Sequence, residues 1–384
     1  MCSKTAIPLF IVLSAFFISC INNKGVRLDE LTVPAKNSFA HAERFTVHKK
    51  DSCTIVTIID PWQGAEKVRQ VYYLVERGKN APQNAEASQI IYVPVRKIIC
   101  MSSTHLAMVS ALGEHRAISG ISGTNYIFDD VLRSRADSGQ IVEVGYDSEI
   151  NDEVILKTDP DLIMMYGIGL ESAGYVGKIS ELGVKIMFNA DYLETDPLGK
   201  AEWIKVFGAL FCKENLADSI FQAEVISYNS IKSSIEEGKF SRPSVLLGLP
   251  FRDTWFVSPG NSYISTIISD AGGKYLWGEY ESSTSMPFSL EAVYMNSLNA
   301  DYWLNAGNAT SLADIAALEP RLTRLPCYTS GRIYNNTKRT SPGGGNDYWE
   351  SGSLNPHIIL KDIASILHPG LFREHELYYY KKLN

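Results

Sequence analysis

The chain has 384 residues, 45% of them hydrophobic and 21% charged, which is typical of a folded protein long enough for two domains of ordinary size. Its formal net charge is −7, so it lacks the basic surface that attracts a nucleic-acid backbone. We therefore expect no nucleic-acid partner.

The N-terminal residues resemble an export signal. Lys4 precedes an apolar run over residues 6–17, which is too short to cross a bilayer comfortably and is followed by small residues. The stretch FISC resembles a bacterial lipobox, in which the cysteine, here Cys20, carries a lipid. We expect a signal peptide over residues 1–19 and a lipid-anchored tether over residues 20–43, with a short membrane anchor as the alternative. The protein would then lie in the periplasm, attached by lipid to a bacterial membrane.

The remaining cysteines do not indicate a metal site. Cys53, Cys100, Cys212 and Cys327 form no CxxC pair, and the histidines lack the spacing of helix-borne metal ligands. An oxidising compartment permits disulfides, but their pairing does not follow from spacing. We expect no bound metal and no cofactor.

Next along the chain come a strand-rich segment and an alternating one. Residues 44–92 contain the runs CTIVTIID and VRQVYYLV around the turn signal DPWQG, which predicts a β-rich extension. Over residues 93–197 the short apolar runs RKIICM, AISGIS, DLIMMYG and VKIMFN alternate with helical stretches. Such alternation predicts parallel strands with crossover helices, that is, an N-terminal α/β lobe.

A long helical pattern and a second alternating segment follow. Residues 198–237 have helical spacing and predict one long linker helix, interrupted near residues 213–215. Alternation resumes over residues 238–384 with SVLLGLP, TWFVSPG, ADYWLNA and GRIYNN and ends in the helix NPHIILKDIASILHP. The fold class is therefore α/β, with two Rossmann-like lobes joined by one long backbone helix and preceded by a β-rich extension.

No stretch carries a catalytic pattern. RKIICMSSTHLAMVSALG predicts a strand, a polar turn and a helix, but it lacks the G-x-S-x-G elbow, and Ser103 and His105 do not face each other. The glycine-rich SPGGGND at residues 341–347 lacks the Lys-Ser/Thr ending of a phosphate loop and predicts a flexible surface loop. We expect no enzymatic activity, and a cleft between the lobes that binds a ligand without chemistry.

A set of motifs resembles one family. NDEVILKTDPDLIMMYG, with RKIICMSSTHLAMVSALGEHRAISGIS before it and LGVKIMFNADY after it, is similar to the periplasmic binding proteins for ferric siderophores, haem and vitamin B12. The resemblance covers residues 93–367 and implies two lobes, one long helix between them and a shallow groove for the ligand. It also implies docking on an ABC permease through one glutamate per lobe. The matching motifs place these at Glu153 and Glu291, each at the start of a predicted helix, where the helix dipole alone also favours a carboxylate.

The resemblance further implies which loops face the ligand. Ser102, Ser103 and Thr104 would form the ligand-facing turn of the first lobe, with Ser103 or Thr104 also capping the helix. Aromatic side chains suit flat or hydrophobic chelates, although ordinary packing is the alternative for each of them. The other expected ligand contacts are Tyr126, Tyr146, Asp147, Trp255, Tyr263, Trp349 and Glu350.

The resemblance implies a monomeric substrate-binding lipoprotein of an ABC importer. It would capture a metal chelate and deliver it to a permease dimer with ATPase subunits. A ferric siderophore or other iron complex is the first expectation, and vitamin B12 (a corrinoid) or haem is the alternative. A lipoprotein that uses the same frame for recognition without transport is the rival, which a large exposed apolar patch on the β-rich extension would favour.

Overall fold

The computed structural model describes residues 41–384 except residues 51, 147–148, 168–178 and 180. The predicted signal peptide, the expected lipid site Cys20 and the expected ligand contact Asp147 lie outside the described residues. Within the described ranges no helix is long and apolar enough to span a bilayer.

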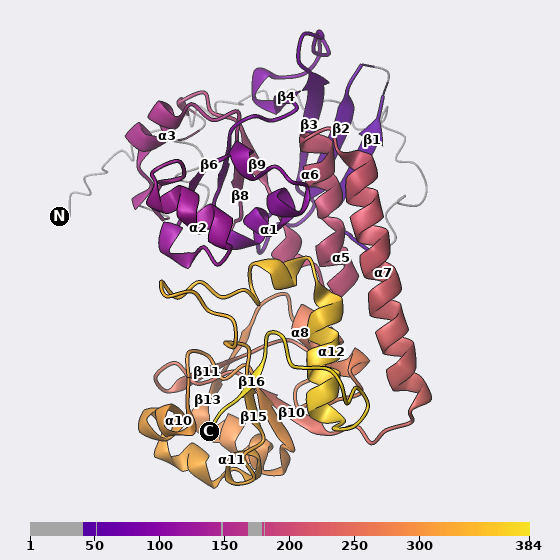
Figure 1. Ribbon diagram of the computed structural model, residues 1–384, viewed down its shortest axis with the longest axis vertical. Coiled ribbons are helices and arrows are strands. Elements are labelled where there is room, and N and C mark those ends of the chain that lie inside the picture. Colours follow the sequence, from indigo (N-terminus) through magenta and orange to yellow (C-terminus); the bar gives the residue numbers. More distant parts are fainter. Residues whose placement is uncertain (1–40, 51, 147–148, 168–178, 180) are drawn as a thin grey trace, which may run out of the picture. The chain divides into compact units, whose positions relative to one another are not determined.

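The β-rich segment forms a four-stranded sheet with the strand order β1-β2-β3-β4 (Figure 1). The first three strands are antiparallel, and β4 is parallel to β3. In β2 the alternating residues Val56 and Ile58 are buried, as expected for a strand with one face on the core. The strands are β1 Phe45–Lys49, β2 Thr54–Ile59, β3 Arg69–Glu76 and β4 Ile90–Val93.

Two buried carboxylates hold the chain just before this sheet. Glu202 Oε2 accepts the backbone N–H groups of His41 at 3.1 Å and Ala42 at 2.8 Å. Glu194 accepts the next two N–H groups along the chain, each at 3.0 Å, and the indole N–H of Trp203. The extension is therefore tied to the helical region that begins at residue 197.

The first lobe contains a five-stranded parallel sheet with the order β7-β6-β5-β8-β9. Both of its faces are covered: Ile98 and Cys100 belong to one core cluster, and Ile99 and Met101 belong to another. Burial on both faces explains why these strands read as continuous apolar runs. The elements are β5 Ile98–Cys100, α1 Ser103–Ala111, β6 Ile118–Ile121, α2 Asp130–Asp137, β7 Val142–Glu143, α3 Asp152–Thr158, β8 Leu162–Met165 and β9 Ile186–Phe188.

Three helices occupy residues 197–237, where the sequence predicts one. They are α5 Pro197–Glu202, α6 Ile204–Leu210 and α7 Glu214–Glu237. The break before α7 lies next to the predicted interruption, and Cys212 there has a φ of 55°, which no helix continues. The long helix is therefore α7 alone, and it packs against both α6 and α12, which spans Pro356–Leu367 (Figure 1).

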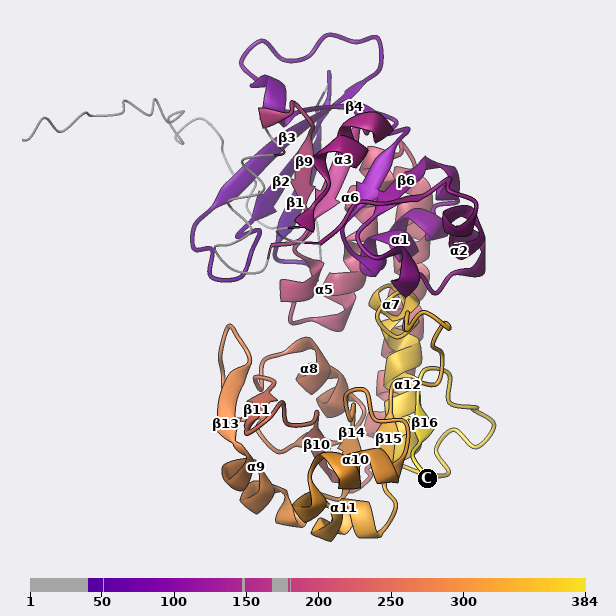
Figure 2. The same ribbon diagram turned by 90° about the vertical axis from the view of Figure 1, so that its left-hand side faces the viewer.

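The second lobe contains a five-stranded sheet with the order β12-β10-β14-β15-β16. Its strands are parallel except β16 at one edge. β11 does not join this sheet as the alternation predicted; it pairs antiparallel with β13 in a separate two-stranded sheet (Figure 2). The reason is visible in its side chains, since Trp255 is buried while Phe256 is exposed, the pattern of a strand with one solvated face.

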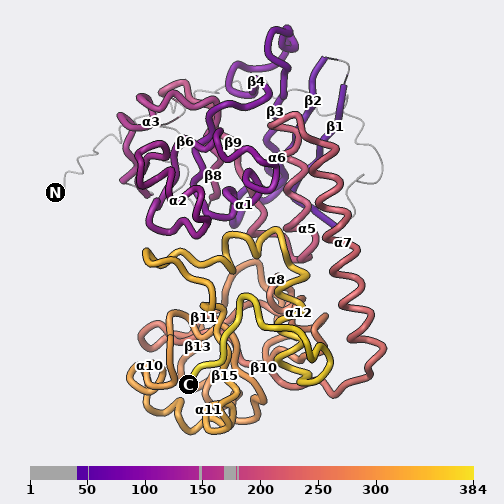
Figure 3. The backbone as a smooth tube through the Cα atoms, viewed as in Figure 1, coloured from indigo at the N-terminus to yellow at the C-terminus, as the bar shows by residue number. Residues whose placement is uncertain are grey.

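The bounds of the remaining elements complete the fold. In the second lobe these are β10 Ser244–Leu247, β11 Thr254–Val257, α8 Tyr263–Asp270, β12 Lys274–Tyr275, β13 Met286–Ser289, α9 Leu290–Asn296, β14 Tyr302–Leu304, α10 Leu312–Leu318, α11 Pro326–Thr329, β15 Ile333–Asn335 and β16 Lys381–Lys382. Short 3-10 helices are Ala87–Gln89, His115–Ala117, Thr124–Tyr126, Asp191–Leu193, Ser297–Asn299, Pro320–Arg324 and Ser351–Ser353. Figure 3 follows the chain through the first lobe, along α7 and into the second lobe.

Candidate functional site

A pocket of about 310 Å³ opens at the carboxyl ends of the first-lobe strands. Its lining follows directly on the strands, with residues 101–103 after β5, Ser122 and Gly123 after β6, and Tyr166 after β8. The carboxyl ends of parallel strands meet at one edge of a sheet, where ligands bind in α/β folds. The second lobe contributes Gly344, Gly345, Asn346 and Trp349.

Half of the predicted ligand contacts come together here. They are Ser102, Ser103, Tyr126, Tyr146 and Trp349. Because two of them come from the turn after β5 and one from the second lobe, segments far apart in the sequence meet in a single pocket. Their contact with a ligand stays a prediction.

The polar turn after β5 differs in one respect from the prediction. Ser102 is the helix cap, and its Oγ accepts the N–H of Thr104 at 3.3 Å. The prediction of a cap at Ser103 or Thr104 was wrong because α1 begins at Ser103, which leaves Ser102 as the extended residue before it. Thr104 contributes its amide and its hydroxyl, 3.1 Å from Ser102 Oγ, to this cap.

Two tyrosines form an aromatic wall of the pocket. The rings of Tyr126 and Tyr146 meet edge to face with centroids 6.4 Å apart, and both side chains are exposed. They meet over Gly123, whose φ is +90° and whose missing side chain leaves the space for the Tyr146 hydroxyl. Partial burial, the nearby carboxylate of Glu143 and the neighbouring phenols raise the pKa of Tyr146. Its hydroxyl therefore stays protonated and can donate a hydrogen bond to a ligand.

Glu143, at the end of β7, supports this wall and was not predicted. Its carboxylate accepts N–H groups from Gly123 at 2.9 Å and 3.0 Å, from Thr124 at 2.7 Å and from Gly145 at 2.9 Å. It also accepts the Thr124 hydroxyl at 3.1 Å. One side chain thus fixes both loops that carry the two tyrosines.

The glycine-rich stretch at residues 341–347 is not the free surface loop that the sequence predicts. Gly344 and Gly345 line the pocket, and Gly343 and Gly345 leave no room for a Cβ atom because the backbone carbonyls of Asn125 and Tyr126 occupy that space. The glycines are therefore required by close approach of the two lobes.

Glu350 follows this loop and is not itself among the lining residues. It is only 4% exposed, and its carboxylate accepts the N–H of Phe128 at 2.8 Å and of Asp129 at 2.9 Å. Burial raises the pKa of Glu350 to about 7. The structure thus places the carboxylate of this expected ligand contact against the backbone of the first lobe.

Of two further expected contacts, Trp255 lies in the core and Tyr263 is half-buried against it. Trp255 is fully buried, and its indole N–H donates to the carbonyl of Leu247 at 2.9 Å. Tyr263, in the first turn of α8, packs against the main core, with Lys200 Nζ 5.2 Å from its ring centroid. Ordinary packing, the alternative that the sequence left open, accounts for the position of Trp255, while ligand contact at Tyr263 stays a prediction.

Several pocket residues were missed by sequence reasoning. Tyr166 follows an apolar strand directly, so the rule that selects residues at the carboxyl ends of parallel strands could have found it. The same rule could have found Met101 after β5 and Ser122 and Gly123 after β6, while Ile121 is the last residue of β6. Gly344, Gly345 and Asn346 depend on the meeting of loops and carry no separate signal.

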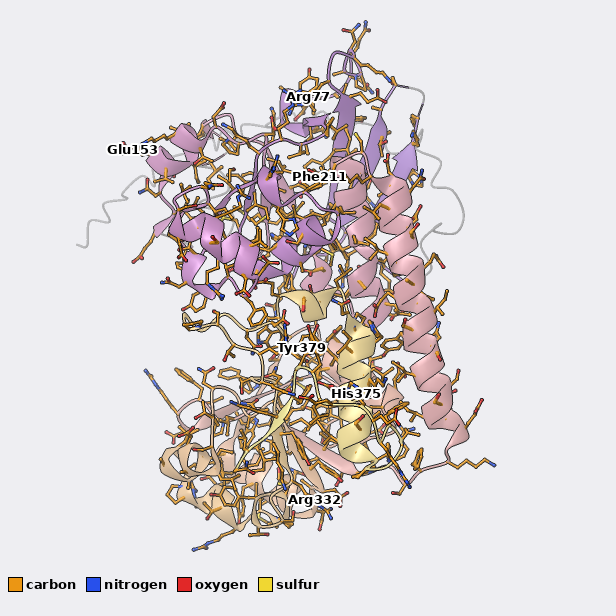
Figure 4. All side chains as sticks on the ribbon, in the orientation of Figure 1. Arg77, Glu153, Phe211, Arg332, His375 and Tyr379 are labelled. Atoms are coloured by element: carbon orange, nitrogen blue, oxygen red, sulfur yellow. The ribbon has the colours of Figure 1, made fainter. Side chains whose placement is uncertain are left out.

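The two expected docking glutamates both lie in the first turn of a helix. Glu153 is exposed in α3, at the edge of the first lobe (Figure 4). Glu291 is exposed in α9, and its Oε1 lies 2.9 Å from Nη1 of Arg321. A backbone N–H and this guanidinium hold the pKa of Glu291 below its usual range, so the carboxylate is ionised near neutral pH.

Comparison with known proteins relates the chain to one family. A family model described as periplasmic binding protein matches residues 98–340. An uncharacterized lipoprotein of Methanocaldococcus jannaschii is 25% identical over 407 residues, covering 98% of this chain and 95% of the relative. A periplasmic heme binding protein from Pseudomonas aeruginosa has a TM-score of 0.54 at 15% identity, covering 72% of this chain and 94% of that chain. A structure of an ABC-type Fe3+-hydroxamate transport system from Saccharomonospora viridis has a TM-score of 0.53 at 17% identity, covering 72% and 94%.

Proposed function

The chain belongs to the periplasmic binding protein family, and from this premise we propose that it is the substrate-binding lipoprotein of an ABC importer for a metal chelate. The observation that carries the proposal is the pocket in which the carboxyl ends of the first-lobe strands and a loop of the second lobe meet. Binding sites of this kind are concave, partly pre-formed and lined by aromatic residues with a few polar groups.

The lining favours a bulky chelate as ligand. Tyr126, Tyr146 and Trp349 offer aromatic faces, and Ser102 and Ser103 offer small hydrogen-bonding groups that leave space. We propose a ferric siderophore or other iron complex as the first choice, with a corrinoid or haem as the alternative. Structures with this fold include proteins described as binding heme and as serving Fe3+-hydroxamate transport, which supports a metal chelate as the ligand class.

The proposal extends to the membrane and to the permease. Cys20 would carry the lipid, which agrees with the description of a relative as a lipoprotein. A monomer would then dock on a permease dimer with ATPase subunits through Glu153 and Glu291. In this proposal the chain consists of a signal peptide, a tether, a β-rich extension and two lobes joined by the linker over residues 198–237.

The rival function, recognition without transport, lacks its expected signature. Among the described residues of the extension, Tyr92 is the large apolar side chain that is exposed, so no large apolar patch is formed there. Exposed large apolar side chains occur instead in the second lobe, for example Phe251, Phe256 and Met295.

Titration of the purified chain tests the proposal. Tryptophan fluorescence and calorimetry would be followed with a ferric hydroxamate, a ferric catecholate, cyanocobalamin and hemin, with correction for ligand absorbance. We expect saturable binding by one class of chelate. The fluorescence change should be smaller in Trp349→Phe, which removes a lining tryptophan, than in the control Trp62→Phe, because Trp62 does not line the pocket. Absence of binding by every chelate would contradict the proposed ligand class.

A further inference from the structure

The segment over residues 123–129, which we call the Tyr126 segment, is held from both lobes. At its beginning, Glu143 of the first lobe accepts the N–H groups of Gly123 and Thr124. At its end, Glu350 of the second lobe accepts the N–H groups of Phe128 and Asp129. Tyr126 lies between these two carboxylate anchors.

The second-lobe anchor, Glu350, makes a buried contact with the Tyr126 segment and not an exposed one. Glu350 is buried, and its two oxygens accept one N–H each at 2.9 Å or less. Arg339 of the second lobe, paired with Asp347 at 2.6 Å, places its guanidinium carbon 5.0 Å from the ring centroid of Phe128. Both the amide and the ring of Phe128 are therefore contacted from the opposite lobe.

The middle of the Tyr126 segment is also in close backbone contact with the second lobe. The α-carbons of Gly343 and Gly345 lie so near the carbonyl oxygens of Asn125 and Tyr126 that neither glycine could carry a side chain. Such backbone-to-backbone contact exists only while the lobes are together. If they separate, the Tyr126 segment keeps the Glu143 anchor and loses all of these second-lobe contacts.

We propose that Glu350 is a positioning residue for ligand binding: without lining the pocket, it fixes the Tyr126 segment and so couples the approach of the lobes to the shape of the aromatic wall. The effect on affinity rests on the proposed function, because it requires that Tyr126 contacts the ligand. The coupling itself is a property of the chain and can be measured without any ligand.

Amide hydrogen exchange of the ligand-free chain tests the coupling. At a pH above about 7, where the Glu350 carboxyl is mostly ionised, we expect exchange at Phe128 and Asp129 to become about tenfold faster or more in Glu350→Ala and Glu350→Gln, since hydrogen bonds to a charged group are lost or weakened. Exchange at Gly123 and Thr124 should not change. The matched control Glu143→Gln should show the reverse pattern, with faster exchange at Gly123, Thr124 and Gly145 and no change at Phe128 and Asp129.

A second variant tests the same coupling in case Glu350→Ala does not fold. Gly345→Ala keeps Glu350 but forces a Cβ atom against the Tyr126 carbonyl, so it should also accelerate exchange at Phe128 and Asp129. Circular dichroism would establish that each variant is folded. Unchanged exchange at these two amides in folded Glu350→Ala would overturn the proposal, and it would do so even if none of the tested chelates binds.

A double-mutant cycle tests how Glu350 acts on affinity, using whichever of the four chelates binds in the titration. Glu350→Ala should weaken binding, and Glu350→Asp, whose shorter side chain retains the charge, should weaken it less. In the background of Tyr126→Ala, Glu350→Ala should have almost no further effect, because contacting residues that act through one another are not additive. Equal losses in both backgrounds would show that Glu350 acts on the ligand directly and would refute a positioning role.

Discussion

At the scale of single residues, Gly123 determines the geometry of the aromatic wall. Its backbone adopts a φ of +90°, which side chains rarely allow, and the space beside its α-carbon is filled by Tyr126 and Tyr146. A substitution here therefore has two separable effects, one on the backbone and one on the tyrosines.

We predict that Gly123→Ala displaces both tyrosines and weakens chelate binding by about tenfold or more, besides costing about 1–3 kcal/mol of stability from strain. Gly139→Ala is the matched control, because Gly139 has a φ of +74° but no atom within 4 Å of its Cβ position. It should lose stability without losing affinity. Thermal unfolding and the fluorescence titration measure the two effects, and equal affinities for the two variants would argue against the assigned wall.

Glu194 shows how burial makes one carboxyl sensitive to pH. It is buried, accepts three N–H groups, and burial raises its pKa from 4.5 to about 7 despite these bonds and the nearby charge of Arg44. The folded state therefore binds the proton more tightly than the unfolded state. This contribution to stability is fully present below 4.5 and is lost as the pH rises through about 7.

The free energy of unfolding should fall between about pH 5 and about pH 8 as Glu194 loses its proton. We predict that in Glu194→Gln this fall is smaller by roughly 2–3 kcal/mol. Urea denaturation of the chain and the variant at both pH values measures this difference. Glu376→Gln serves as a control because Glu376 is exposed, and its pKa is lowered by Lys338, so it does not contribute in this direction. An identical pH dependence of the chain and Glu194→Gln would contradict the assignment.

At the scale of elements, the sequence predicts what depends on neighbouring residues. The strands β5, β6, β8 and β10 and the helices α3 and α12 follow from apolar runs, periodicity and start signals. The pairing of β11 with β13, the break after α5 and the cap at Ser102 were not predicted. They depend on tertiary contacts or on a shift of one residue, which local pattern does not determine.

The candidate site divides in the same way. Five of the ten expected contacts line the pocket. Ser102, Ser103, Tyr126 and Tyr146 do so because residues after parallel strands share one edge of a sheet, whereas Trp349 comes from the late loop of the second lobe. Glu143 and the glycines of the late loop could not be identified, because their roles arise from backbone groups contributed by other segments. The same holds for Glu350, whose partners are more than 200 residues away in sequence, at separations of 222 and 221.

Helix α7 offers a test of packing at this scale. Its buried side chains, including Phe221 and Tyr228, lie on one face, while Ile226 is 69% exposed on another. We predict that Phe221→Ala costs about 3–5 kcal/mol of stability, because it leaves a cavity against His41 and Lys205. Ile226→Ala on the same helix should change stability by less than about 0.5 kcal/mol. Chemical denaturation measures both, and similar losses would show that the assigned face is wrong.

At the scale of the whole molecule, the proposed function separates binding from delivery. The pocket lies between the two lobes, whereas Glu153 and Glu291 are exposed on α3 and α9 and are not among the pocket-lining residues. Exposed carboxylates of this kind affect association with a partner more than they affect a distant site.

We predict that the double variant Glu153→Ala with Glu291→Ala abolishes uptake in proteoliposomes that contain the permease and its ATPase subunits, while chelate affinity stays unchanged. Glu76→Ala with Glu376→Ala is the control, since these carboxylates are also exposed, with side-chain exposures of 60% and 90%. Full transport by the docking variant would remove these two residues from the permease contact.

The attachment of residues 41–44 to Glu194 and Glu202 has a mechanical consequence. A force applied to the chain before His41 acts first on the hydrogen bonds from residues 41–44 to Glu194 and Glu202, near the beginning of the helices that join the lobes. These contacts come before β5, β6 and β8, the strands from which the pocket loops emerge. If the chain is anchored at its N-terminal end, as proposed, force on that anchor therefore reorients the molecule through residues 194 and 202 before it reaches the loops around the ligand pocket.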